Sequence, residues 1–157
     1  MHTLLISAHA TAGVVALVFA CVVLRVPRSP RTARFTVYYG ATAALLVFMI
    51  LAVITDWQVL NVTQRVVFSG LIALGAYTFV RAEQARRALH DRPAGWRRRY
   101  VDHVGFTAIS LFDGFAIIAA IDLGTPPVVV GVVAVFGVIA GIVTINTVKR
   151  RMHVPAV

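Results

Sequence analysis

The chain has 157 residues, of which 59% are hydrophobic and 13% are charged. A soluble domain of this length could not bury so much apolar surface, so the composition excludes a soluble globular protein and indicates an integral membrane protein. The net charge of +9 does not indicate a nucleic-acid partner, because the basic residues flank apolar segments alternately along the chain instead of forming one patch.

Five apolar segments are long enough to be transmembrane helices, since a helix needs about 20 mostly apolar residues to cross about 30 Å of hydrocarbon. These segments lack the alternating pattern of a membrane β-barrel. The sequence therefore predicts an all-α, polytopic helix bundle that forms a single transmembrane domain over residues 1–157. The five helices are expected at approximately residues 3–24, 35–54, 66–80, 104–121 and 126–148.

The third segment is the shortest, and its helix has room to begin earlier, within residues 59–64. At its other end the helix is expected to continue past the lipid headgroups to about His90, with Glu83 and Arg87 as an i,i+4 pair. Pro93 and Gly95 then end the helix.

The basic residues predict the orientation of the bundle. Fourteen of the fifteen cations fall between the first and second segments, between the third and fourth, or after the fifth, and only Arg65 falls on the other side. Short loops rich in lysine and arginine stay in the cytoplasm, so five crossings place the N-terminus outside and the C-terminus inside. Fourteen arginines against one lysine are typical of a GC-rich bacterial genome, which indicates a multi-pass protein of the inner membrane.

Glycines supply the predicted helix contacts. Gly137 and Gly141 lie four residues apart in the fifth segment, and Gly13 follows His9 at the same spacing in the first. Small residues at this spacing let another helix approach closely. Two interpretations of the fifth-segment pair stay open, namely packing within the chain and association into a homo-oligomer or a larger membrane complex.

Asp113 is the most informative polar residue, because it interrupts a run of apolar residues. At 100° per residue, His103, Phe106, Ser110 and Asp113 follow one stripe of the fourth helix. Asp113 is about 15 Å from His103 along the helix axis, which places the carboxyl near the middle of the membrane. A buried carboxylate is costly, so it should be paired, be protonated or face a watery cavity.

His9 is the candidate partner of Asp113. It lies about 8 Å into the first helix from the outer side, and its depth differs from that of Asp113 by about one helical turn. A contact between the two side chains is allowed if the first and fourth helices touch. The hypothesis is therefore a proton or ion site formed by Asp113, His9, Ser110 and His103, and the alternative is a structural hydrogen bond from Asp113.

Metal and cofactor chemistry has little support in the sequence. His9 and His103 lie near opposite faces of the membrane and cannot share one haem iron. The sequence has no Cys/His cluster with zinc spacing, no phosphate-binding loop and no nucleophile motif. No enzyme activity, metal or resident cofactor is predicted, although a cofactor shared with another subunit stays open.

The stretch HATAGVVALVF, with His9 and Gly13, and the later stretch RRRYVDHVGF give one resemblance. The chain resembles small bacterial membrane proteins of unknown function that carry a His-x-x-x-Gly motif in the first helix. Such proteins often have a second histidine where the second helix begins, whereas here that position reads Arg34-Phe35. The resemblance implies that His9 is noteworthy, and it implies no activity.

Three functions remain as hypotheses from the sequence. The first is a small proton- or cation-linked transporter or channel that uses Asp113 and His9, and the second is a non-catalytic subunit of a larger membrane complex. The third is a membrane redox or lipid enzyme. The first is favoured, because ionisable residues inside a membrane usually serve a function.

Overall fold

The computed structural model describes residues 2–24 and 32–151 of the chain. The described residues form helices joined by short turns and contain no strand, so the all-α class predicted from the sequence is confirmed. The helices are α1 (His2–Val23), α2 (Ala33–Asp56), α3 (Val62–Asp91), α4 (Trp96–Asp122) and α5 (Pro127–Arg151).

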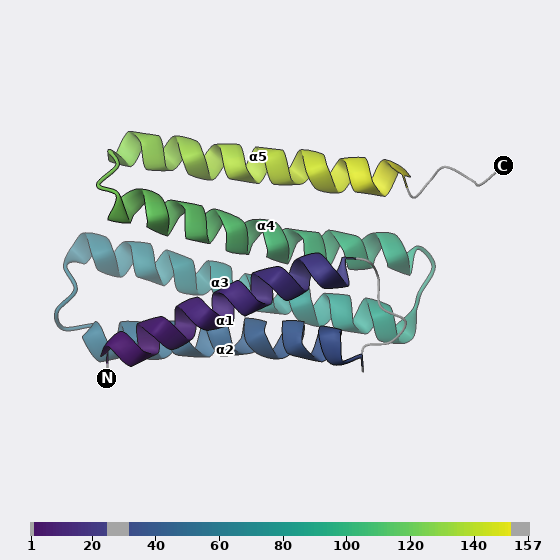
Figure 1. Cartoon of the computed structure of the whole chain (residues 1–157), viewed down its shortest axis with the longest axis horizontal. Coiled ribbons are helices and arrows are strands. Elements are labelled where there is room, and N and C mark those ends of the chain that lie inside the picture. Colours follow the sequence, from purple (N-terminus) through teal and green to yellow (C-terminus); the bar gives the residue numbers. More distant parts are fainter. Residues whose placement is uncertain (1, 25–31, 152–157) are drawn as a thin grey trace.

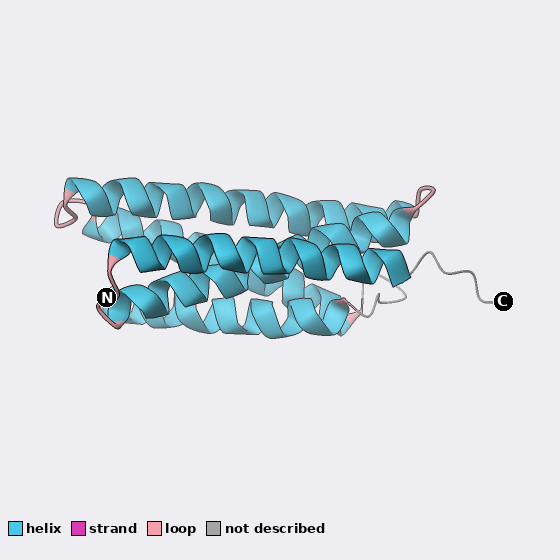
Figure 2. Ribbon diagram, turned by 90° about the horizontal axis from the view of Figure 1, so that it is seen from above, coloured by secondary structure: helices cyan, strands magenta, loops and turns pink. Residues whose placement is uncertain are grey.

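Each helix runs antiparallel to the one before it, as Figure 1 shows. The start of α1 and the turns α2–α3 and α4–α5 lie at one end of the bundle, and the turn α3–α4 and the end of α5 lie at the other. In the second view as well, the described turns α2–α3, α3–α4 and α4–α5 lie at the two ends of the bundle (Figure 2). By length and composition, α1 to α4 are each able to cross a membrane, and α5 is apolar over the shorter stretch Gly131–Thr147.

The helices α3 and α4 extend beyond their apolar parts. A capping box starts α3, because Asn61 accepts from the Gln64 backbone and the Gln64 side chain accepts from the Asn61 backbone. At its other end α3 continues to Asp91 and stops where Arg92 takes a left-handed conformation with φ of 47°. Hydropathy detects only the part of a helix that crosses hydrocarbon, so it could not give these polar ends.

The helix α4 begins at Trp96, well before the apolar run expected from residue 104. The turn before it contains Gly95 with φ of 71°, a conformation that favours glycine. The first turns of α4 carry Arg97, Arg98 and Arg99, which are polar yet good helix formers. The first turns of α4 therefore lie outside the apolar part of the bundle, next to the α3–α4 turn.

The larger core of the bundle lies at the end where α3 meets α4. Its buried side chains come from α1 to α4 and are Ala20, Val23, Phe35, Tyr38, Ala82, Ala85, Ala88, Leu89, Tyr100, Val101 and Val104. The Tyr100 hydroxyl donates to the Val23 carbonyl at 2.9 Å. This bond satisfies one of the carbonyls that the last turn of α1 leaves without a helical partner.

Basic side chains gather at this same end. Arg34, the seven arginines of residues 81–99 and Arg150 belong to helix ends that lie there (Figure 1). Arg65 belongs to the opposite end, where its Nε donates to the Trp57 carbonyl at 3.1 Å. Residues Arg25, Arg28 and Arg31 of the first basic loop lie outside the described residues.

Glu83 is the centre of a set of polar contacts at the basic end. Glu83 accepts from Arg86 at 2.7 Å and from Arg87 at 2.9 Å, which confirms the predicted Glu83–Arg87 pair. Tyr39 of α2 donates to the same carboxylate at 3.2 Å and so links α2 to α3. These contacts hold α3 in place on its α2 side.

Candidate functional site

Asp113 lies on α4, and its side chain faces α5. Only 8% of its surface is exposed, and its Oδ1 atom has no hydrogen-bond partner among the described residues. A methyl group added at Gly137 of α5 would overlap Oδ1, so the carboxyl oxygen rests directly on the α5 backbone. An uncompensated polar atom of this kind is costly in an apolar setting.

Gly137 belongs to a regular series of close contacts between α4 and α5, in which a glycine of one helix faces a larger side chain of the other. One turn away, a Cβ added at Gly141 would lie 2.5 Å from three side-chain atoms of Ile109. In the next turn the roles reverse, and a Cβ added at Gly105 of α4 would meet Ile145 of α5 at 2.7 Å. Gly137 and Gly141 thus make their close contacts with α4 of the same chain.

His9 points to a different neighbour. Its Nδ1 lies 3.1 Å from the Leu45 carbonyl of α2. A carbonyl can only accept, so Nδ1 carries the proton in this contact. A Cβ added at Gly13 would also meet Leu45, at 3.0 Å, so both residues of the His-x-x-x-Gly motif lie against α2.

The structure does not bring His9 and Asp113 together. Gly13 lies level with Phe115, since an added Cβ would come within 2.8 Å of that ring. His9 is one turn further along α1, and Asp113 is two residues back along α4, so the two are offset by about 9 Å along the bundle. No hydrogen bond or ion pair joins these two described side chains.

Ser110 and His103 share a helix with Asp113 without forming a cluster with it. Ser110 is partly buried and lies about 4.5 Å along the axis from Asp113, whereas His103 is about 15 Å away. The His103 carbonyl accepts from the Thr107 hydroxyl at 3.2 Å. The predicted four-residue site is therefore divided. His103, Ser110 and Asp113 extend over about 15 Å of α4, whereas His9 lies at the interface between α1 and α2.

The sequence reasoning missed a charged pair between α3 and α4. Arg81 donates to the Asp102 carboxylate at 2.8 Å, and its guanidinium lies 5.2 Å from the centre of the Phe106 ring. Tyr77 contacts the same ring edge-on. The sequence identifies Arg81 only as one of the basic residues that predict the topology, although it directly follows the apolar run of α3.

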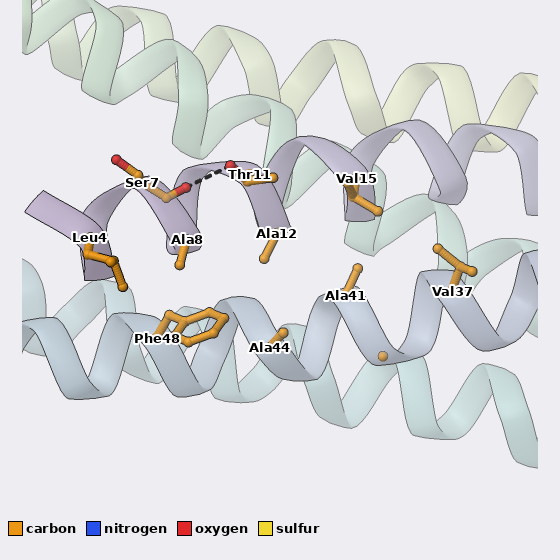
Figure 3. Close-up of a pocket in the computed structure, with 11 residues that line it drawn as sticks. Leu4, Ser7, Ala8, Thr11, Ala12, Val15, Val37, Ala41, Ala44 and Phe48 are labelled. Atoms are coloured by element: carbon orange, nitrogen blue, oxygen red, sulfur yellow. Dashed lines mark hydrogen bonds between the residues drawn. The ribbon is translucent and has the colours of Figure 1, made fainter.

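A shallow groove between α1 and α2 carries no polar group that could do chemistry. Its floor is formed mainly by small side chains that face one another across the two helices, including Ala8, Ala12, Ala41 and Ala44 (Figure 3). The Thr11 hydroxyl donates to a carbonyl of its own helix at 2.8 Å. None of the lining residues belongs to α4 or α5, so the groove does not lead to Asp113.

Within residues 2–24 and 32–151, no three His, Cys, Asp or Glu side chains gather as they would around a metal ion. No protein-family model, curated protein or solved structure matches this chain. The main indication of function is therefore the buried carboxyl of Asp113 at the α4–α5 interface.

Proposed function

We propose that the chain is a five-span protein of a bacterial inner membrane, with its N-terminus outside and its C-terminus in the cytoplasm. The 25 residues of α5 extend over about 37 Å, which exceeds the roughly 30 Å of hydrocarbon. Basic helix ends gather at one end of an antiparallel bundle, which supports this orientation. The His-x-x-x-Gly motif of α1 also supports the proposed relation to small bacterial membrane proteins that carry the same motif.

Reporter fusions test this topology. A reporter that is active only in the cytoplasm is expected to be active after Val157 and inactive when inserted into residues 122–126. The reason is that the positive-inside rule holds the basic end of the bundle in the cytoplasm. The opposite pattern of activity would contradict the orientation.

We further propose that Asp113 is the ion-binding group of a small proton- or cation-linked transporter or channel. The observation that carries this proposal is the buried Oδ1 atom without a hydrogen-bond partner among the described residues. An ionised carboxyl in this position would be strongly unfavourable, so the group must bind a positive ion when α5 covers it.

The alternative role for Asp113 is a structural hydrogen bond between helices. Such a role needs a polar group on the neighbouring helix that pairs with the carboxyl, for example a side chain that accepts from its protonated form. The α5 residue that meets Oδ1 is Gly137, which has no side chain, and its backbone lies within a continuous helix. The geometry therefore favours ion binding over a structural role.

Proton flux into liposomes that contain the purified protein tests the proposal. Flux driven by a membrane potential should exceed that of protein-free liposomes, and Asp113→Asn should reduce it to the protein-free level, because an amide does not exchange a proton in this range. Asp91→Asn is the matched control, since Asp91 is exposed at the end of α3. Wild-type flux equal to the protein-free level, or full flux in Asp113→Asn, would contradict the proposal.

A second candidate function is a non-catalytic subunit of a homo-oligomer or larger membrane complex. The observation that favours it is the position of α5, which packs against α4 alone among the described helices. Its other faces expose large apolar side chains, such as Phe136 at 72%. Purification from a native membrane should then give a complex of fixed stoichiometry, and a monomer in mild detergent would contradict this function.

A further inference from the structure

The space beside the Asp113 carboxyl is occupied by α5. Because a Cβ at Gly137 would overlap Oδ1, the α5 backbone stands where a water molecule or metal ion bound to Oδ1 from that side would lie. The same interface is closed on the adjoining turn, where Ile109 lies against Gly141. Oδ1 is therefore sealed from one side by a helix that lacks any polar side chain at that point.

A metal cation would need more ligands than this position offers. Calcium takes six to eight oxygen ligands, and magnesium requires a near-octahedral set. In the described part of the chain, Asp113 belongs to no group of three or more His, Cys, Asp or Glu side chains that could hold a metal ion. The carbonyls nearby belong to continuous helices and already accept helical hydrogen bonds.

The helices α1, α3 and α5 pack against α4, and no ion pair joins Asp113 to any of their described residues. The helix α5 has no titratable residue between Pro127 and Thr147. On α3 the nearest titratable residues to the level of Asp113 are Arg65 and Tyr77. Tyr77 contacts Phe106, two turns away along α4 from Asp113.

The titratable residues of α1 and of α4 itself also lie away from Asp113. On α1 the titratable residues after the first turn are His9, which bonds to α2, and Cys21, which is exposed; His2 is the first residue of the helix, seven residues before His9. On α4 itself, the nearest titratable residues to Asp113 are His103 and Asp122, which are ten and nine residues away in opposite directions along the helix. With α5 in this position, Oδ1 of Asp113 has no hydrogen-bond partner among the described residues, and no ion pair to Asp113 is formed among them.

We infer that the ion bound by Asp113 is a proton, not a metal cation, and that it exchanges only when α5 moves away from α4 at Gly137. The inference rests on the proposed function of Asp113 and names its ligand. A proton needs no coordination shell beyond the carboxyl oxygen. Movement of α5 is the simplest route of access, because α4 is the only described helix that holds α5 in place.

The first arm of the test identifies the ion. The carboxylic C=O infrared band of Asp113 is titrated with pH in liposomes containing sodium, potassium or choline chloride, with Asp113→Asn as the spectral reference. The midpoint should be the same in the three salts. A competing cation would move the midpoint by about one pH unit for each tenfold rise in its concentration, and such a shift would overturn the inference.

The second arm locks α5 onto α4. In a Cys21→Ser background, Ile109→Cys with Gly141→Cys places two Cβ atoms within about 4 Å, a distance that a disulfide spans. Oxidation should slow hydrogen–deuterium exchange of the Asp113 carboxyl by at least about tenfold, and reduction should restore it. Equal exchange in the oxidised and reduced protein would overturn the gating role of α5.

Single glycine variants test the gating role of α5 in a second way, without a crosslink. Gly137→Ala should accelerate the exchange, because the new methyl group pushes α5 away from Oδ1. Gly131→Ala is the matched control on the same helix, since nothing lies within 4 Å of its added Cβ, and it should exchange like the wild type. If Gly137→Ala exchanges no faster than Gly131→Ala, α5 does not gate the site.

The outcomes separate this inference from the proposed function. If flux requires Asp113 but the titration midpoint follows the sodium concentration, the transport function stands and the proton inference fails. If the midpoint is independent of salt and the lock slows exchange while Asp113→Asn retains full flux, the sealed proton site stands and the transport function fails.

Discussion

Gly141→Ile is expected to separate α5 from α4. The added Cβ would already lie 2.5 Å from three atoms of Ile109, and the branched side chain adds further volume at the same point. Overpacking of this kind costs about 1–3 kcal/mol and sometimes more. The cost falls on the only described interface that holds α5. Limited proteolysis in detergent should then cleave the α4–α5 turn or α5 itself faster than in the wild type.

The control for this prediction lies on the same helix. An added Cβ at Gly131 meets nothing within 4 Å, so Gly131→Ile should leave the cleavage pattern unchanged. The two variants add the same side chain to the same type of residue. Equal resistance of both variants to proteolysis would contradict the packing of Gly141 on Ile109.

Arg81→Leu is expected to lower the free energy of unfolding by about 1–3 kcal/mol. The change removes the ion pair with Asp102 and the contact with the Phe106 ring in one step. Breaking a fully buried pair costs more, but here the side chains of Arg81 and Asp102 are 17% and 37% exposed, and solvent weakens the pair. Unfolding in a denaturing detergent, followed by circular dichroism, measures the loss.

Arg98→Leu is the matched control for Arg81. Arg98 is exposed and has no ion pair with any described residue, so its replacement should change the unfolding free energy little. A double-mutant cycle with Asp102→Asn isolates the pairwise term. Equal effects of Arg81→Leu and Arg98→Leu would show that the α3–α4 pair does not stabilise the bundle.

The helical fold could be predicted from the sequence because each helix has its own apolar signal. Length and hydropathy identify a membrane helix without knowledge of its neighbours. The polar ends of α3 and α4 gave no such signal, since Arg81 to Asp91 and Trp96 to His103 are helical without being apolar. There the turn formers Pro93 and Gly95 were the better guides, because they mark where α3 has to end.

The partner of Asp113 could not be predicted from a stripe on one helix. Helical periodicity shows which residues share a face, and it leaves open which helix that face meets. Depth alone made His9 a candidate, but α1 turns His9 toward Leu45 of α2. Asp113 and Gly137 were each singled out in the sequence, and only the structure joins them.

The short turns contain a signal that could have found these contacts. Asp113 and Gly137 are equidistant along the chain from Thr125 in the α4–α5 turn, and so are Ile109 and Gly141. In a tight helical hairpin, residues at equal distances from the turn lie at the same depth. Combining this register with the facing stripes would have predicted both contacts.

The infrared carboxyl spectrum of Asp113 in lipid, taken as the difference between wild type and Asp113→Asn, tests most directly whether a proton occupies the site beneath α5. The expected result is a carboxylic-acid C=O band at neutral pH that converts reversibly to a carboxylate band as the medium becomes alkaline. A carboxylate spectrum at neutral pH that persists into mildly acidic solution would contradict it, because the group would then be solvated or ion-paired.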